Sequence, residues 1–332
     1  MHCSRIPSSR RLTGTAARSK KVHIPQKNTV TGRCMIKIPL IISIIVIAAA
    51  VIFFWGWFSS DLIIKQTKIP LETRPDDFGL VYEEVRFKAE DGTALKGWFI
   101  PYHGSAVTIV VLHGWGANKG SMLPSSHYLH HRGQYNLLLF DLRNHGESEG
   151  SVTSFGPLEK KDLRAAVSFL KQKHSAEAQS IGVFGSSLGG TIGILTAAEM
   201  PAIDAVVAES AFTDPRHVIV RYAKLFYRLP HYPIVSISML FAQLRLGVWF
   251  GKHRAVDAIA RIAPRPVFII QGEQDVRMPV QEGTMLVEAA GEPKSYWSVP
   301  DADHGEVYLK SSAEYERKVL QFFNQSFSQA KP

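Results

Sequence analysis

Gly185-Ser186-Ser187-Leu188-Gly189 is the stretch that decides the fold. It follows an apolar run, residues 181–184, and precedes a helix-like stretch, residues 191–200. The order of strand, G-x-S-x-G and helix is typical of a nucleophile elbow, a tight turn that exposes a serine hydroxyl. Small residues suit this turn because it forces unusual backbone angles and brings strand and helix close together. We therefore expect Ser187 to be a nucleophile if the rest of the chain supplies its partners.

Short apolar stretches alternate with helix-like segments on both sides of this turn. This pattern predicts an α/β fold in which a mostly parallel sheet is covered by helices on both faces. Glu90-Asp91-Gly92 is typical of a hairpin turn, so the first two strands should form an antiparallel edge. The expected strands are 81–88, 94–100, 108–112, 136–140, 180–184, 205–208, 266–270 and 294–299, and the expected helices are 121–131, 157–172, 191–200, 280–290 and 311–327.

An insertion, residues 211–263, interrupts this alternation. No strand is apparent in it, and residues 216–229 and 233–247 have helical patterns rich in large apolar side chains. We expect a helical lid over the strand ends, although helices that simply pack on the sheet would show the same pattern. In either case these residues are expected to supply an apolar substrate pocket.

The net charge of +9 is concentrated at the N-terminus. Residues 1–37 contain nine of the 38 Lys and Arg residues and no acid, which leaves 38 − 9 = 29 bases against 29 acids. The rest of the chain is therefore neutral, and the high pI does not indicate binding to nucleic acid. Both cysteines, Cys3 and Cys34, are in this segment, which we expect to be a disordered basic tail. The remainder needs no disulfide framework and has no cysteine metal site.

Residues 38–58 form an uncharged apolar run with a cluster of aromatic residues at its end. Its length predicts a transmembrane anchor, with the aromatic rings at the headgroup level. A buried core helix or a cleaved signal peptide are the alternatives. The preceding positive charge predicts a single-pass membrane protein with a cytoplasmic N-terminus and its main domain, residues 80–330, on the extracytoplasmic side. Residues 59–79 are expected to be a polar linker.

A serine nucleophile needs an imidazole to take its proton and a carboxylate to orient that imidazole. Asp275 follows the apolar run 266–270, and His304 follows the strand 294–299. The order Ser187, Asp275, His304 matches one known order of such triads. Asp301 and Asp303 compete with Asp275 for the acid role, but they lie very close to His304 in sequence.

The oxyanion formed in such a reaction needs two fixed N–H donors. The Leu188 amide, directly after the nucleophile, is one candidate. The other should lie in the loop His113-Gly114-Trp115-Gly116 after the first central strand, with Trp115 preferred and Gly116 second. His113 is expected to brace this loop, and His145 to have no catalytic role.

The HGWG loop at 113–116, the DLRNHGES loop at 141–148, GSSLGG at 185–190, GEQD at 272–275 and DADHG at 301–305 together resemble the α/β-hydrolase superfamily. The resemblance covers about residues 80–327 and is nearest to the serine aminopeptidase or prolyl-oligopeptidase-like branch, which includes members with an N-terminal membrane helix. It implies Ser187, Asp275 and His304 as a catalytic triad and residues 141–148 as a support loop.

The function expected from these features is that of a membrane-anchored serine hydrolase acting on a carboxylic ester, thioester or lipid acyl bond through an acyl-enzyme. A peptidase or aminopeptidase of the same fold is the alternative, and a non-catalytic scaffold is a third hypothesis. No cofactor motif is apparent, and His127, His130 and His131 are expected to be a solvated helix face and no metal site. The expected partners are a small-molecule or lipid ester and the membrane.

Overall fold

The computed structural model describes residue 21 and residues 32–328, so most of the expected basic tail lies outside the described residues. The chain divides into two compact units, Met1–Ala50 and Val51–Pro332. Helix α1 (Gly32–Ser59) covers the expected anchor and begins six residues before it. By length and composition, the span Lys37–Ile64 could cross a membrane, with a mean hydropathy of 2.9. Among the described residues, the only other segment of this kind is the pair His231–Leu246 and Phe250–Ile262, which is bent by 72°.

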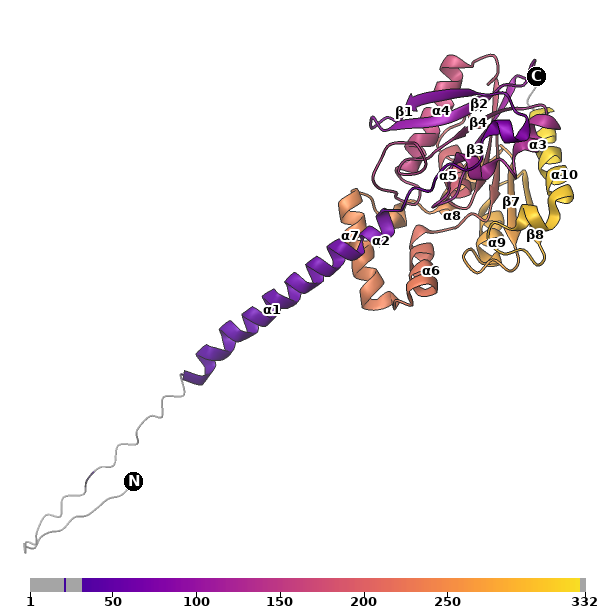
Figure 1. Cartoon of the computed structure of the whole chain (residues 1–332). Coiled ribbons are helices and arrows are strands. Elements are labelled where there is room, and N and C mark those ends of the chain that lie inside the picture. Colours follow the sequence, from indigo (N-terminus) through magenta and orange to yellow (C-terminus); the bar gives the residue numbers. More distant parts are fainter. Residues whose placement is uncertain (1–20, 22–31, 329–332) are drawn as a thin grey trace, which may run out of the picture. The chain divides into compact units, whose positions relative to one another are not determined.

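The second unit is built on one eight-stranded sheet with the order β1-β2-β4-β3-β5-β6-β7-β8 (Figure 1). β1 pairs with β2, and β2 with β4, in antiparallel fashion, while every pairing from β4 to β8 is parallel. The prediction of a mostly parallel sheet with an antiparallel hairpin edge is confirmed. The strands are β1 (Glu83–Lys88), β2 (Ala94–Ile100), β3 (Val107–Leu112), β4 (Asn136–Phe140), β5 (Ser180–Ser186), β6 (Ala205–Glu209), β7 (Val267–Gly272) and β8 (Lys294–Val299).

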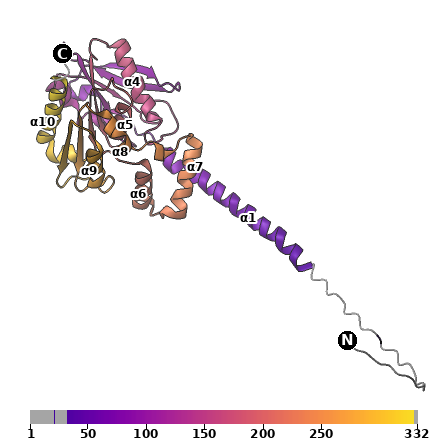
Figure 2. The same ribbon diagram turned by 180° about the vertical axis from the view of Figure 1, so that it is seen from behind.

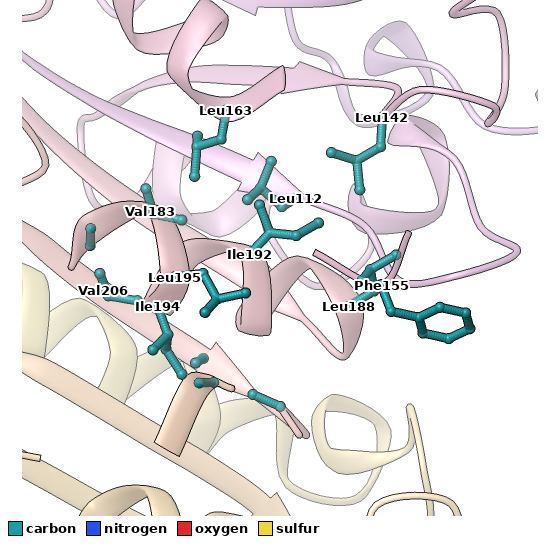
Figure 3. Packing of buried hydrophobic residues seen from close by; sticks show 14 of the residues in the cluster. Leu112, Leu142, Phe155, Leu163, Val183, Leu188, Ile192, Ile194, Leu195 and Val206 are labelled. Atoms are coloured by element: carbon teal, nitrogen blue, oxygen red, sulfur yellow. The ribbon is translucent and has the colours of Figure 1, made fainter. Parts of the chain in front are cut away.

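Helices cover both faces of this sheet because alternate side chains of each buried strand point to opposite faces. On β3, Val110 packs in one core cluster and Ile109 in the other. The first cluster includes side chains of α4 (Glu159–Lys173), α5 (Leu188–Ala197), α8 (Ala255–Ala258) and α9 (Val280–Ala289), and the second includes side chains of α3 (His127–His131) and α10 (Val307–Ser328). Figure 2 shows the placement of α4, α5, α8, α9 and α10 around the sheet. Every residue of α5 is buried, and its Ile192 and Ile194 lie among side chains of neighbouring elements such as Leu112 and Val183 (Figure 3). The helix that starts at the elbow is thus held in the centre of the fold.

Two stretches differ from the expectations. The predicted helix 121–131 is divided into a 3-10 turn, η2 (Lys119–Met122), and α3. Pro124 lies between them, and proline has no N–H with which to continue a helix.

The expected polar linker, residues 59–79, is attached to the rest of the second unit. It contains α2 (Asp61–Ile64) and η1 (Pro75–Phe78), and Ile63 and Ile64 are buried. The Gln66 side chain donates a hydrogen bond to the Asn144 carbonyl at 2.7 Å, and the Thr153 N–H donates one to the Ile64 carbonyl at 2.7 Å. Two adjacent isoleucines in a mostly polar stretch are the reason that it packs instead of remaining extended.

The insertion between β6 and β7 is helical, and residues 210–266 contain no strand. Its main helices are α6 (Pro215–Tyr227) and α7 (Ser236–Leu246), which project together from the sheet (Figure 1). α6 begins one residue before the expected helix 216–229, because Asp214 accepts the Arg216 N–H and Pro215 occupies the first helical position. Shorter turns complete the insertion: η3 (His231–Val235), η4 (Phe250–Lys252), α8 and η5 (Ile259–Ile262).

Candidate active site

Ser187 lies between β5 and α5 in a backbone conformation that L-residues rarely adopt, with φ of 53° and ψ of −113°. Its N–H donates to the Glu209 carbonyl at 2.7 Å, which ties the turn to the end of β6. The flanking glycines are required by close approach. A Cβ on Gly185 would lie 2.4 Å from the backbone of Gly189, and one on Gly189 would lie 2.4 Å from the Leu112 carbonyl oxygen. The geometry is that of a nucleophile elbow.

Asp275 and His304 meet across the loops that follow β7 and β8. The His304 Nδ1 atom lies 2.7 Å from the Asp275 Oδ2 atom, and the Asp275 side chain is fully buried. The other oxygen of Asp275 accepts the N–H groups of Arg277 and Met278 at 2.9 and 2.7 Å. A carboxylate held in this way orients the imidazole and leaves its Nε2 atom to exchange a proton.

The other aspartates do not take this position. Asp303 accepts the backbone N–H of His304 at 2.7 Å through Oδ1, and the Val276 N–H at 3.3 Å. It therefore shapes the loop, while its neighbour Asp301 has an exposed side chain. The structure brings Asp275, and neither competitor, to the imidazole.

Ser187 and His304 line one cavity of about 730 Å³. No hydrogen bond joins their side chains in the described part of the chain, which is common before substrate binds. Most of the lining is apolar and comes from the loop 113–116, α6 and the first residues after α1. Its large side chains are Leu62, Ile63, Trp115, Met122, Phe155, Ile219, Tyr222, Phe226, Tyr227, Leu229, Val235 and Tyr308.

Hydrogen bonding distinguishes the candidate oxyanion donors, because one of the three N–H groups already has an acceptor. The N–H groups of Trp115 and Leu188 donate to no other group of the described chain. Trp115 lines the same cavity as Ser187, and Leu188 follows Ser187 directly in the chain. The Gly116 N–H instead donates to the Nε2 atom of His145 at 3.2 Å. Since this donor is already engaged, the structure places Gly116 in loop bracing and leaves Trp115 and Leu188 as the candidates.

His113 braces its loop, as expected, and His145 acts in a similar way. The Nε2 atom of His113 accepts the Leu142 N–H at 3.0 Å, so its Nδ1–H donates to the Gly114 carbonyl at 2.8 Å. His145 is held in the same way, with its Nδ1 atom 2.8 Å from the Arg143 carbonyl. Burial lowers the pKa of His113 to about 3 and also lowers the pKa of His145. Neither ring is protonated at neutral pH.

Charged groups buried in the loop 141–148 support these braces. Asp141 accepts both the backbone N–H and the ammonium group of Lys119 at 2.7 Å, and Lys119 also lies over the Trp98 ring. Arg143 pairs with Asp162 at 2.7 Å and with Asp91 at 2.8 Å. Each buried charge has an opposite charge beside it, which is the condition under which such groups stabilise a loop. This is the role that the family resemblance implied for the loop.

Glu209 is a residue of the site that sequence reasoning missed. It ends β6 opposite Ser186, lines the cavity, and accepts a hydrogen bond from the Tyr315 hydroxyl. Burial raises the pKa of this carboxyl group. The sequence signal was its position, since it directly follows an expected strand whose carboxyl end lies beside the elbow.

No candidate metal site is present in the part of the chain that the structure describes. The rings of His127, His130 and His131 lie 2.9 to 3.2 Å from backbone carbonyl oxygens. They brace neighbouring segments.

Comparison with known proteins agrees with this geometry. Bacillus subtilis YqkD is 30% identical over 237 residues, which cover 70% of this chain and 76% of that protein. Arabidopsis thaliana WAV2, an alpha/beta hydrolase domain-containing protein, is 28% identical over 257 residues, 75% of this chain and 80% of its own.

Among solved structures, the Pyrococcus furiosus esterase Pf2001 superposes with a TM-score of 0.67 at 28% identity, covering 79% of this chain and 99% of that one. A Pyrococcus horikoshii acylaminoacyl peptidase shares the fold, with a TM-score of 0.55 at 19% identity over 75% of this chain and 41% of its own. The alpha/beta hydrolase family model matches residues 109–317. The chain belongs to the alpha/beta hydrolase family.

Proposed function

We propose that this hydrolase is a membrane-anchored serine esterase that cleaves a carboxylic ester, thioester or lipid acyl bond through an acyl-enzyme. The observation that carries the proposal is the 2.7 Å contact between Asp275 and His304 in a cavity that also contains Ser187 in a strained elbow. Strained backbone at one serine, with a buried acid and an imidazole beside the same cavity, is the arrangement expected of an activated nucleophile.

In the first step the Ser187 Oγ atom attacks the substrate carbonyl carbon while the His304 Nε2 atom takes the hydroxyl proton. The Trp115 and Leu188 N–H groups hold the oxyanion. Collapse of this intermediate breaks the bond to the leaving group, which receives the proton from His304. Water then attacks the acyl-enzyme with His304 again as base, and the acid product leaves with Ser187 restored.

The lining of the cavity favours acyl esters over peptides. Long apolar and aromatic side chains dominate it, whereas a peptide would need partners for its backbone N–H and C=O groups. The 28% identical Pyrococcus furiosus protein is described as an esterase, which supports the same choice. An aminopeptidase of this fold remains the second candidate.

Labelling with a fluorophosphonate probe tests the nucleophile. The wild-type chain should be labelled, and Ser187→Ala should abolish labelling. Ser186→Ala is the matched control, because its hydroxyl lies beside Glu209 on the same turn and should not be needed. Labelling that survives Ser187→Ala would refute the assignment.

A substrate panel tests the bond that is cleaved. We expect turnover of p-nitrophenyl esters to rise with acyl chain length and to exceed turnover of aminoacyl-arylamides. Faster cleavage of the arylamides would favour the peptidase.

The anchor and its orientation are proposed from residues 38–58 and the positive charge before them. The only two cysteines, Cys3 and Cys34, precede this run in the sequence. A membrane-impermeant maleimide should therefore label the chain only from the cytoplasmic side. Labelling of intact cells or sealed right-side-out vesicles would contradict the orientation.

A further inference from the structure

The insertion carries most of the exposed large hydrophobic side chains found between residues 65 and 328. Between residues 65 and 328, twelve large hydrophobic side chains are exposed, and seven of them lie between 225 and 249. Single exposed apolar residues are ordinary, but a concentration of this kind marks an interaction surface. We name these seven the rim: Leu225, Phe226, Tyr227, Tyr232, Leu240, Leu244 and Trp249.

The insertion is also strongly basic, although the chain beyond the tail is neutral. Residues 211–263 contain eight Lys or Arg (Arg216, Arg221, Lys224, Arg228, Arg245, Lys252, Arg254 and Arg261) against Asp214 and Asp257. Some of these cations pair with acids, as Arg221 does with Glu282 at 2.7 Å. Lys224 and Arg228, which flank the rim residues of α6, are exposed and form no ion pair with a described residue.

The rim is continuous with the last turns of α1, within the second unit. The rings of Phe53 and Phe241 lie 5.5 Å apart, and the Ser59 and Ser238 hydroxyls are 2.6 Å apart. The Arg245 guanidinium pairs with Asp61 at 2.7 Å and lies over the Trp57 ring. Residues 51–58 are almost all exposed and apolar. Rim and helix end therefore form one surface in which aromatic and aliphatic groups lie beside arginine and lysine.

The elements that carry the rim also form the wall of the catalytic cavity. Phe226 and Tyr227 from α6, Ser238 from α7, and Ser59 and Leu62 beside the end of α1 all line it. A molecule in contact with the rim thus lies against elements that form the wall of the cavity containing Ser187.

We propose that the rim is a second membrane-binding surface, which inserts into the interface of an anionic bilayer and admits an acyl lipid from that bilayer directly to Ser187. The proposal rests on the proposed function. Exposed aromatic and aliphatic groups beside unpaired cations match the headgroup boundary of anionic lipids. A second copy of the chain fits less well, because two rims would bring cations against cations.

The test uses the full chain in lipid nanodiscs. Cys3 and Cys34 are changed to Ser, and Tyr232→Cys, at a rim position that is 75% exposed, is labelled with an environment-sensitive fluorophore. Ser175→Cys, on an exposed turn after α4 and outside the rim, is the matched control. We expect nitroxide lipids to quench the Tyr232→Cys label roughly twofold or more in anionic discs and to leave the control unchanged.

Charge reversal provides the second arm. Lys224→Glu with Arg228→Glu, neither of which lines the cavity, should reduce quenching in anionic discs and slow hydrolysis of an ester lipid in anionic vesicles. Turnover of soluble p-nitrophenyl acetate should not change. Equal rates on vesicles for the variant and the wild type would argue against the charge-dependent contact.

Quenching absent at Tyr232→Cys while Ser187 still reacts with fluorophosphonate would overturn the proposal. The fluorophore could instead quench itself, to an extent that depends on the number of copies per disc and not on nitroxide lipid. That result would identify a second copy of the chain as the occupant of the rim and would also overturn the proposal. Failure of Ser187 to react, by contrast, would refute the proposed function alone.

Discussion

Two regions of the domain differ in how their side chains are satisfied: the edge of the sheet that holds Ser187, and the helical insertion. At the sheet edge, buried polar groups are joined by short hydrogen bonds, as in the loops of His113, Asp141 and Asp275. In the insertion, α6 and α7 leave large apolar side chains at the surface, and Lys224 and Arg228 are exposed beside them. Under the proposed function, the first region positions the reacting atoms and the second controls which substrates reach them.

This difference indicates where changes should affect chemistry and where they should affect access. Buried hydrogen-bonded groups have no alternative partners, so their loss costs the full desolvation penalty. Exposed side chains can move or be replaced at little cost to folding. Substitutions at the sheet edge should therefore be severe, and those in the insertion mild for stability but visible in substrate choice.

The largest effect is expected at the acid of the site. Asp275→Asn should lower kcat for a short ester by about 10,000-fold, because the amide favours the wrong tautomer of His304. Steady-state kinetics with p-nitrophenyl butyrate would measure the loss. Asp303→Asn, which changes an aspartate that contacts only backbone N–H groups, should cost far less. Similar losses in both variants would contradict the role of Asp275.

A methyl group at the elbow should destabilise the fold strongly. Gly185→Ala places a Cβ 2.4 Å from backbone atoms of Gly189, which cannot move aside, so we expect a loss of about 3 kcal/mol of unfolding free energy. Gly251→Ala, in the insertion, approaches only the flexible guanidinium of Arg216, at 3.1 Å. Urea unfolding should show less than about 1 kcal/mol for this control. Equal losses of unfolding free energy in Gly185→Ala and Gly251→Ala would contradict the expected difference between the sheet edge and the insertion.

Acid should weaken the sheet edge through His113. Its pKa is about 3 in the folded chain, against an ordinary 6.5, so the unfolded chain takes up the proton first as the pH falls. The contribution of the neutral His113 ring to stability is fully present above pH 6.5 and falls by about 1.4 kcal/mol per pH unit between pH 6.5 and about 3. His113→Gln, which cannot titrate, should be less stable at pH 8 but lose less on acidification. Urea unfolding at several pH values measures both slopes, and identical slopes would show that His113 does not contribute.

The smallest effect on folding is expected in the insertion. Phe226 is 53% exposed yet lines the cavity, so Phe226→Ala should change the unfolding free energy by about 1 kcal/mol or less. Its effect should appear in the ratio of rates on long-chain and short-chain esters, which we expect to fall roughly fivefold through lost apolar contact. Leu309→Ala, which is 76% exposed and does not line the cavity, is the control. An unchanged ratio of long-chain to short-chain rates would show that Phe226 of α6 does not contribute to recognition of the acyl chain.

Much of the sheet could be predicted from sequence because its strands are short, apolar and bounded by polar turns. β2, β4 and β8 begin and end at the predicted residues. β5 runs two residues further than expected, through Gly185 and Ser186. Those residues belong to the strand because of their pairing with Ala208 and Glu209, a long-range contact that no local pattern contains.

The parts of the site that could not be predicted depend on partners that are distant in sequence. The Gly116 N–H looks like an oxyanion donor until His145, 29 residues away, is seen to accept it. Glu209 has no motif of its own and gains its position from Tyr315, 106 residues later. The packing of residues 59–79 similarly depends on a surface formed by loops around Asn144 and Thr153.

The backbone of Ser187 has a consequence for how this gene can change over generations. A φ of 53° with a ψ of −113° is costly for serine and easy for glycine, so a mutation to glycine would relieve strain of about 1–3 kcal/mol. Random mutation that is screened only for folding would therefore favour glycine at position 187. Under the proposed function, serine is retained at this strained position for its hydroxyl group and at a cost in stability.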